Sequence, residues 1–515
     1  MGKNIMFQGT GSSVGKSLLT AGLCRALYNR GYAVAPFKSQ NMALNSFITK
    51  EGGEMGRAQV VQAEAAGIEP SVKMNPILLK PTSHVGSQVI IEGKVYGNLK
   101  AKEYQQEKVH LKKRVHKIYQ SLSEEYEAVI IEGAGSPAEI NLREHDLVNM
   151  GLAKMVDAPV ILIGDIDRGG VFASIYGTIM LLEPKERERI KGFIINKFRG
   201  DIEILKPGIQ MMEEKIGIPC LGVMPYDRFM IEDEDSVTHR FDGVRKPEKQ
   251  GAQSPLVKVG VIKLPYVSNF TDFMPLEMEG DVELTYIQDP KDCENQDLLI
   301  IPGSKNTLHD RRFLMERGFD EKIYRQVKQG TLVIGICGGY QILGRTLGDQ
   351  YQVESEIREI NGLGLLDIDT VMEKEKTTRQ ITGEVPRFTP SSHGNNRETE
   401  VTGYEIHMGC TTRRERARPW IRLKDGSLDG SIDEKGQVFG TYLHGIFEND
   451  GFRRDLLEYL KNKRSGLTFR SSVVEAQGEK EALSFKELKN QEYNRLAAMM
   501  EEHLDMDALL KIMGW

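Results

Sequence analysis

The chain has 515 residues, which fits two or three domains, because a single hydrophobic core stops growing at about 250–300 residues. Its abundant charges are mixed and sum to a formal −6 at pH 7, which argues against a general binder of nucleic acid or anionic membranes. Five scattered cysteines without a C-x-x-C pair give no zinc or dithiol signature and favour a reducing compartment. With no apolar run suited to a signal core or a bilayer span, the sequence predicts a cytoplasmic protein.

The first part of the chain alternates short apolar runs with amphipathic stretches of helix length. Such an alternation predicts a parallel sheet covered by helices, and we expect this first domain over residues 1–231. Residues 232–255 are polar and lack any period that could bury a face, which predicts a linker. The predicted buried strands are residues 5–8, 33–37, 128–131, 159–163 and 192–196.

A second series of strands predicts another α/β domain, over residues 256–462. A charged insertion is expected near residues 373–400. In the tail, residues 463–515, the leucines, tyrosines and methionines after residue 485 recur at helical spacing, so we expect one or two helices packed on the second domain. The strands of this second series are predicted at residues 257–262, 298–301, 332–336 and 437–442.

A glycine-rich loop at residues 9–17 follows the first predicted strand and opens a helix, as a phosphate-binding P-loop does. Small residues let backbone amides surround phosphate oxygens, Lys16 adds a positive charge, and the Ser17 hydroxyl can bind magnesium. The usual spacing puts glycine five residues before Gly15, where this chain has Thr10. The loop residues expected to bind ATP are Thr10, Gly11, Ser12, Ser13, Val14, Gly15, Lys16 and Ser17.

Two acidic residues are candidates for holding the magnesium of the nucleotide. Glu132 ends a predicted buried strand, on the side where open sheets bind ligands, so it can hold a metal ion or cap the loop that follows. A buried carboxylate at that position needs a cation or hydrogen-bond donors to offset its desolvation. Glu54, in a glycine-rich stretch, is a further magnesium candidate.

The variant phosphate loop resembles that of dethiobiotin synthetase and its relatives, a P-loop branch that phosphorylates carboxylates. This resemblance implies that Lys38 approaches the reacting carboxyl and the terminal phosphate, although such a lysine alone is typical of a solvated surface. It also implies that Asn196, at the end of a predicted strand, reads the adenine edge of ATP. The alternative for Asn196 is a plain turn residue.

Cys337 lies at a sharp turn between a predicted strand and a helix, in the sequence GICGGYQ. Flanking glycines allow this turn, and the N-terminus of the helix favours the thiolate over the thiol, so the pattern predicts a nucleophile elbow. A thiolate that attacks an amide needs a base that later protonates the departing ammonia. His444, just after a late strand, is the best candidate, and His407 is the competitor.

Gly-x-Cys-x-Gly-x-Gln with a later histidine at a strand end is similar to class I glutamine amidotransferase domains. The resemblance implies that Gly338 and Gln341 help to bind glutamine or its oxyanion. Those enzymes usually place glutamate two residues after the histidine, where this chain has Ile446. Glu448 or a backbone carbonyl would then have to orient His444.

Residues 302–307, PGSKNT, follow a predicted strand, and backbone amides near Gly303 and Ser304 are candidate oxyanion donors. The alternative is an ordinary turn. The chain shares three features with the subgroup that contains cobyric acid synthases and cobyrinic acid diamide synthases, and so resembles it. These are the PGSKNT segment, the GYEIH segment at residues 403–407 and the lack of a glutamate two residues after the histidine.

Over nearly its whole length the chain resembles the cobyric acid synthase family. The stretches QNMALN at residues 40–45, GRAQ at 56–59 and DIDRGGVF at 165–172 are similar to signature stretches of that family. The expected fold class is therefore α/β, with an N-terminal P-loop parallel-sheet domain, a C-terminal class I amidotransferase-like domain and a helical extension.

The resemblance implies an enzyme that uses ATP, Mg²⁺ and L-glutamine to amidate the b, d, e and g carboxylates of adenosyl-cobyrinic acid a,c-diamide. A carboxylate oxygen is a poor leaving group, so phosphorylation must precede attack by ammonia. Within the same chemistry, the alternatives are cobyrinic acid a,c-diamide synthase and an amidotransferase for a lipid-linked glutamate. A different alternative is a regulatory P-loop ATPase fused to an inert glutaminase-like module. No nucleic acid or membrane partner is expected.

Overall fold

The computed structural model describes residues 2–81, 86–232, 244–245, 257–389, 398–465 and 483–515. The chain forms two compact units. Unit 1 comprises Met1–Ala43, Gly53–Glu234 and Lys486–Trp515, whereas unit 2 comprises Leu44–Gly52 and Asp235–Phe485. Within the described residues, every helix is too short or too polar to span a bilayer.

Unit 1 is built on a six-stranded parallel sheet with the order β12-β11-β10-β1-β9-β2. A second sheet of this unit has the order β3-β6-β7-β8. The elements of unit 1 are β1 Lys3–Gly9, α1 Lys16–Asn29, β2 Val34–Phe37, β3 Gln40–Met42, β5 Glu54–Gly56, α2 Arg57–Ala65, η1 Val72–Met74, β6 Ile77–Pro81, β7 Gly86–Ile91, β8 Lys94–Lys100, α3 Ala101–Glu125, β9 Ala128–Glu132, η2 Ile140–His145, α4 Met150–Met155, β10 Val160–Asp165, α5 Val171–Leu181, α6 Pro184–Arg187, β11 Ile190–Phe198, α7 Ile202–Ile216, β12 Cys220–Pro225, α13 Phe485–His503 and α14 Met506–Met513.

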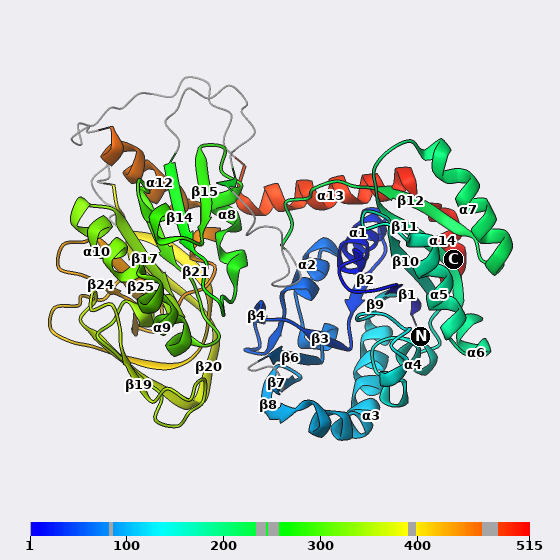
Figure 1. Ribbon diagram of the computed structural model, residues 1–515, viewed down its shortest axis with the longest axis horizontal. Coiled ribbons are helices and arrows are strands. Elements are labelled where there is room, and N and C mark those ends of the chain that lie inside the picture. Colours follow the sequence, from blue (N-terminus) through cyan, green and yellow to red (C-terminus); the bar gives the residue numbers. More distant parts are fainter. Residues whose placement is uncertain (1, 82–85, 233–243, 246–256, 390–397, 466–482) are drawn as a thin grey trace. The chain divides into compact units, whose positions relative to one another are not determined.

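The parallel sheet of unit 1 confirms the five strands predicted for the first domain (Figure 1). Its central strands are apolar on both faces, because helices cover both faces of such a sheet. Ile5, Phe7, Ile130 and Ile163 are fully buried. Since all strands run parallel, the loops after β1, β2, β9, β10 and β11 lie along one edge of the sheet, where open α/β sheets bind ligands.

The C-terminal helices pack on unit 1, so the expectation that they pack on the second domain is wrong. Met500, Leu509 and Met513 belong to the same core cluster as residues of β1 and α1. Lys3 Nζ donates a hydrogen bond to the carbonyl of Gly514 at 2.6 Å, which joins the two ends of the chain. Helical periodicity predicts that a face is buried, but it does not identify the surface that buries it.

Glu232, at which the predicted linker begins, is buried rather than solvated. Its carboxylate accepts hydrogen bonds from Arg57 at 2.8 Å and from Lys489 of α13 at 2.7 Å. Burial opposes ionisation, but these two cations outweigh it and hold the pKa of Glu232 far below its ordinary value. Apart from Val244–Arg245, which form β13, the rest of the predicted linker lies outside the described residues.

We expect Glu232→Ala to destabilise unit 1 by roughly 3–5 kcal/mol, because it leaves two buried cations without their shared carboxylate. Thermal unfolding followed by calorimetry measures this effect. Arg30→Ala is the matched control, since it removes the exposed ion pair between Arg30 and Glu501 of α13 and should cost about 1 kcal/mol or less. Equal melting temperatures for the two variants would contradict the prediction.

Unit 2 contains a seven-stranded sheet with the order β13-β15-β14-β16-β17-β25-β24, whose five inner strands are parallel. A second sheet has the order β19-β18-β20-β22-β23, with β21 paired to β20. The elements of unit 2 are β4 Ser46–Ile48, β13 Val244–Arg245, β14 Val257–Ile262, η4 Phe270–Phe273, α8 Met274–Glu277, β15 Val282–Ile287, η5 Pro290–Cys293, β16 Leu298–Ile301, α9 Thr307–Arg317, α10 Phe319–Gln329, β17 Leu332–Ile336, α11 Gly338–Ile342, β18 Thr346–Gly348, β19 Glu359–Asn361, β20 Ile368–Pro386, β21 Glu398–Arg413, β22 Ile421–Leu423, β23 Leu428–Asp429, β24 Ser431–Ile432, β25 Val438–Thr441, η6 Ile446–Glu448 and α12 Asp450–Arg464.

The four strands predicted for the second domain are β14, β16, β17 and β25. The charged stretch expected as an insertion is mostly regular structure, because β20 and β21 pair as long antiparallel strands. Residues 390–397 of that stretch lie outside the described residues. A strand exposed on one side tolerates alternate charged residues, which explains how a charged sequence forms a sheet.

A short piece of the N-terminal sequence belongs to unit 2. Residues 44–52, which we call the strap, include β4 and pack on unit 2, although they lie between two parts of unit 1 in the sequence. Ile48 of the strap is fully buried and clusters with Tyr404 and Ile406 of β21. The two units are therefore not the two consecutive segments that the sequence led us to expect.

Candidate active site

The loop between β1 and α1 has the conformation of a phosphate-binding cradle. Ser13 and Gly15 have positive φ angles, 59° and 100°. A Cβ atom at Gly15 would lie 2.1 Å from Nδ2 of Asn196, so only glycine fits there. Lys16 folds back over the loop, and its Nζ donates to the carbonyls of Gly11 at 2.9 Å and Gly135 at 3.1 Å.

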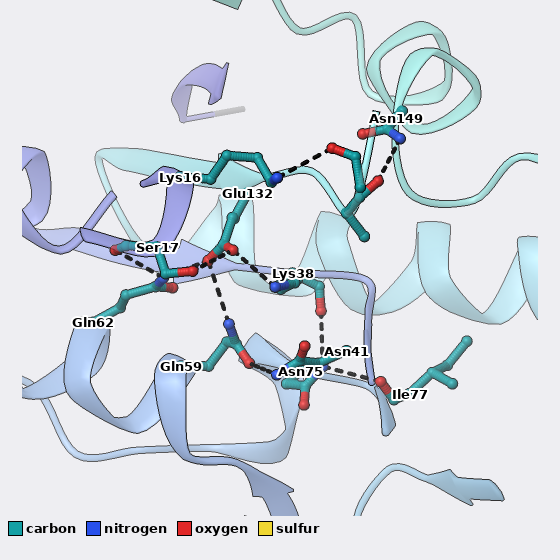
Figure 2. A network of polar contacts seen from close by, with 12 residues as sticks. Lys16, Ser17, Lys38, Asn41, Gln59, Gln62, Asn75, Ile77, Glu132 and Asn149 are labelled. Carbon is teal, nitrogen blue, oxygen red and sulfur yellow. Dashed lines mark hydrogen bonds and ion pairs between the residues drawn. The ribbon is translucent and has the colours of Figure 1, made fainter. Parts of the chain in front are cut away.

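Glu132 ends β9 beside this loop, is fully buried, and is surrounded by hydrogen-bond donors (Figure 2). Ser17 Oγ and Lys38 Nζ both donate to Oε1 of Glu132, each at 2.8 Å. On the other oxygen, Gln62 Nε2 donates at 2.5 Å and Gln59 Nε2 at 3.4 Å. These donors offset the cost of burying the carboxylate, which lies beside the phosphate loop where a metal ion could bind.

The residues at Glu132 fit a magnesium ion. A serine hydroxyl and a carboxylate are hard oxygen ligands, and Mg²⁺ usually keeps several water molecules in addition to one or two protein ligands. Oε1 of Gln62 is buried and makes no hydrogen bond to any described residue, which suits an acceptor for a metal-bound water. No group of three or more histidine, cysteine, aspartate or glutamate side chains in the described residues has metal-ligand geometry, so the oxygens of ATP would have to complete the coordination shell.

The structure brings Ser17, Lys38 and Glu132 together, as the predicted nucleotide site requires. Glu54, the further magnesium candidate, forms a buried ion pair with Lys80 at 2.8 Å. Asn196 lies against the phosphate loop, where its Nδ2 donates to the carbonyl of Val14 at 2.8 Å. In this conformation the amide of Asn196 supports the cradle, and contact with adenine stays a prediction.

Cys337 lies between β17 and α11 at a strained turn, with φ 51° and ψ −107°. A Cβ atom at Gly339 would lie 1.9 Å from the carbonyl oxygen of Ile301, and one at Gly335 would lie 2.6 Å from Gly339. The glycines therefore permit the close approach of strand and helix that the elbow needs. Cys337 Sγ lies 3.6 Å from the carbonyl oxygen of Ile406.

His444 is buried and hydrogen bonds to Cys337, while its role as the base stays a prediction. Its Nδ1 lies 2.7 Å from Oδ2 of Asp272, whose other oxygen accepts a hydrogen bond from the backbone N–H of Gly445 at 3.1 Å. Asp272 therefore has the position of the third triad member, for which the sequence suggested Glu448 or a carbonyl. Burial disfavours the imidazolium, but Asp272 and Cys337 outweigh it and raise the pKa of His444 to about 10.

His407 is not paired with Cys337 in this arrangement. Its Nδ1 lies 2.8 Å from the carbonyl oxygen of Gly409, and its ring stacks on Tyr442 with centroids 3.7 Å apart. Burial lowers the pKa of His407 to about 4, so its imidazole is neutral near pH 7. A neutral ring held in this way does not supply the proton that His444 can supply.

Gly303, Ser304, Gly338 and Gln341 all lie around Cys337 and His444. A Cβ atom at Gly338 would lie 2.8 Å from the backbone nitrogen of Ser304, and one at Gly303 would lie 3.2 Å from Cε1 of His444. Gln341 Nε2 donates to the Tyr442 hydroxyl at 3.2 Å, while its buried Oε1 makes no hydrogen bond to any described residue. These positions suit an oxyanion site beside the elbow.

We expect Asp272→Asn to lower kcat for glutamine hydrolysis by roughly 10²–10³-fold, since the amide neither fixes the tautomer nor stabilises the imidazolium. Removing the charge of Asp272 also lowers the pKa of His444. As the pH rises, the variant should therefore lose the imidazolium, and with it activity, at a lower pH than the parent chain. The pH profile of ammonia release measures both effects. Glu448→Gln is the control, and an equal loss there would contradict the assignment.

Gln62 and Asp272 were missed by the sequence analysis. The signal for Gln62 is its spacing of three from Gln59, which puts both amides on one face of α2. Asp272 lies 172 residues before His444, so no local spacing reveals it.

Comparison with known proteins identifies two domains in this chain. Residues 5–236 match the family described as "CobQ/CobB/MinD/ParA nucleotide binding domain", and residues 258–452 match "CobB/CobQ-like glutamine amidotransferase domain". Fold and site thus define an ATP-using, glutamine-dependent amide synthase that carries both domains on one chain.

Three curated relatives are named "Cobyric acid synthase". They come from Clostridium acetobutylicum (49% identity, 99% of this chain and 98% of the relative), Alkaliphilus metalliredigens (51%, 99% and 99%) and Listeria welshimeri (50%, 100% and 97%). The chain therefore belongs to the cobyric acid synthase family.

Proposed function

We propose that the chain converts adenosyl-cobyrinic acid a,c-diamide to adenosyl-cobyric acid by amidating its b, d, e and g carboxylates with ATP and glutamine. The observation that carries this proposal is the presence, on one chain of this family, of the Ser17–Lys38–Glu132 cluster and the Cys337–His444–Asp272 arrangement. The first suits phosphoryl transfer to a carboxylate, and the second suits release of ammonia from an amide.

In the synthetase half, the carboxylate oxygen of the corrinoid attacks the terminal phosphorus of ATP, and ADP leaves. Lys16 and Lys38 offset negative charge as the phosphoryl group moves, and the loop amides hold the remaining phosphates. Ser17 and Glu132 would hold the magnesium ion, which supplies further charge stabilisation. Ammonia then attacks the acyl phosphate, the carbon–oxygen bond breaks, and phosphate departs as the amide forms.

In the glutaminase half, the Cys337 thiolate attacks the side-chain amide carbon of glutamine, and backbone amides near Ser304 and Gly338 stabilise the oxyanion. The imidazolium of His444 gives its proton to the departing ammonia. Cys337 is then joined to the glutamyl group as a thioester. His444 then takes a proton from water as water attacks this thioester, and glutamate departs. Asp272 keeps the ring in the required orientation and favours its protonated form.

Ammonia must reach the acyl phosphate before water protonates it, so a protected path between the two sites is part of the proposal. We expect glutamine to support synthesis at neutral pH far better than an equal concentration of ammonium salt. Equal efficiency of the two nitrogen sources would remove the need for such a path.

The test of the substrate is the mass of the product after incubation with ATP, Mg²⁺ and glutamine. Adenosyl-cobyrinic acid a,c-diamide should gain four amides, with one ADP released for each. If only cobyrinic acid is amidated, at its a and c carboxylates, the chain has the chemistry of the a,c-diamide synthase. If ATP is hydrolysed and neither corrinoid changes, the regulatory ATPase alternative holds.

A further inference from the structure

The strap, residues 44–52, contacts Tyr404, which packs on His444 of the glutaminase site, and Asn269, which bonds to Asp272 beside that histidine. The backbone N–H of Ser46 donates to Oδ1 of Asn269 at 3.0 Å. The carbonyl of the same residue accepts a hydrogen bond from the hydroxyl of Tyr404 at 3.1 Å. One residue of the strap thus joins two segments of unit 2, one that carries Asp272 and one that packs on His444.

Asn269 controls the position of Asp272. It has a left-handed backbone, with φ 52°, and precedes the short helix η4. Its carbonyl accepts a hydrogen bond from the backbone N–H of Asp272 at 3.0 Å. The carboxylate of Asp272 in turn hydrogen bonds to Nδ1 of His444. A shift of Asn269 would therefore move the carboxylate that orients the imidazole.

Tyr404 contacts His444 directly. Its ring stacks on the imidazole with centroids 5.3 Å apart and an interplanar angle of 17°. Its backbone exchanges hydrogen bonds with that of His444, at 3.2 Å and 2.9 Å. Phe47 of the strap packs edge-on against the Tyr404 ring at 5.1 Å, so the strap contacts this support through its side chains as well as its backbone.

The strap is fixed to unit 2 beyond Ser46 too. Gln380 Nε2 donates to the carbonyl of Ile48, and Thr378 Oγ1 donates to the carbonyl of Gly52 at 3.1 Å. Asn45, which precedes Ser46, is fully buried, yet neither amide atom has a partner among the described residues. Burying an amide without hydrogen bonds lowers the stability of the fold. An asparagine at this position therefore favours a functional reason over a packing reason.

We propose that the strap is a positioning element of the glutaminase: through Ser46 it holds Asn269 and Tyr404, and thereby sets the geometry of His444 against Cys337. This inference rests on the proposed function, in which those two side chains hydrolyse glutamine. The strap continues residues 40–43 of unit 1, where Asn41 donates to Gln59 beside Glu132. Glutamine hydrolysis thus depends on a segment whose preceding residues belong to the nucleotide-binding unit.

Two variants of the full-length chain test this role. Tyr404→Phe keeps the ring on His444 and removes the hydroxyl that binds Ser46. Asn269→Gly tolerates the left-handed backbone and removes the acceptor. We expect each to lower kcat for glutamine hydrolysis by about 10–100-fold with KM within about twofold, because small misplacements of a catalytic group have effects of this size. Ammonia-dependent synthesis should stay unchanged.

The rate at which iodoacetamide alkylates Cys337, followed by mass spectrometry against pH, is the second readout. It reports on the pairing of Cys337 with His444 and does not require that glutamine be the substrate. We expect slower alkylation with a shifted pH profile in both variants. Thr378→Val is the matched control, since it removes the contact at Gly52 and leaves Ser46 in place, and both of its rates should match the parent chain within about twofold.

Parental kcat and alkylation in both variants would overturn the inference. An equal loss of ammonia-dependent synthesis would also overturn it, because the damage would then be general. If the proposed function fails instead, the parent chain itself will not hydrolyse glutamine, while the alkylation profiles still decide whether the strap positions His444.

Discussion

Cys337→Ala is expected to abolish glutamine-dependent synthesis and to leave ammonia-dependent synthesis intact. Without a nucleophile the thioester cannot form, and His444 and Asp272 have no reaction to assist. Loss of the nucleophile of such a unit lowers kcat by roughly 10⁶-fold, so the residual rate should fall below detection. The synthetase half keeps its phosphate loop and Glu132, so ammonium chloride at alkaline pH should restore the product.

The measurement is glutamate release and corrinoid amidation with each nitrogen source. Cys410→Ala is the matched control, because Cys410 is an exposed cysteine of the same unit. Normal glutaminase activity in Cys337→Ala, or equal losses in the two variants, would show that the elbow is not the nucleophilic site.

Lys16→Ala is expected to stop synthesis with either nitrogen source, by roughly 10³–10⁵-fold, while glutamine hydrolysis continues. Lys16 is buried and held at the loop by two carbonyls, which places its charge where the terminal phosphates would bind. Loss of a positive charge that stabilises a transferring phosphoryl group has effects of this order.

ADP release and amide formation, each with glutamine and with ammonium, measure the Lys16 effect. Lys197→Ala is the matched control, because Lys197 donates to the loop carbonyl of Ser13 at 2.6 Å and pairs with Asp165. It should weaken ATP binding and lower kcat less than tenfold. Synthesis by Lys16→Ala at the parental rate would contradict a phosphate-binding role.

Much of the fold was predictable because its signals are local. The runs that form β1, β9, β10 and β17 are apolar and short, and the loops after β1 and β17 have the glycines that their geometry requires. Lys38 was expected near the phosphates from the family resemblance and Glu132 at the ligand-binding edge from its place at the end of a buried strand, but their ion pair was not predicted.

What the sequence could not predict depends on distant partners. Asp272, which occupies the position of the third triad member, comes from the short helix η4 far back in the chain, so neither motif nor spacing identifies it. The strap and the C-terminal helices have ordinary apolar patterns, and such patterns do not specify which unit provides the matching surface. The buried Glu232 looked like part of a solvated acidic run because its partners, Arg57 and Lys489, are remote in sequence.

Unit 1 takes residues from both sides of unit 2 in the sequence, because Gly53–Glu234 precede and Lys486–Trp515 follow the segment Asp235–Phe485. During translation, most of the nucleotide-binding unit is therefore made first. Its helices α13 and α14 are made only after residues 235–485. Domains tend to fold as they emerge, so the amidotransferase half can mature while the apolar surface around α1 is still uncovered. A chain truncated before residue 486 would lack α13 and α14, and the apolar surface of unit 1 that these helices bury would stay exposed.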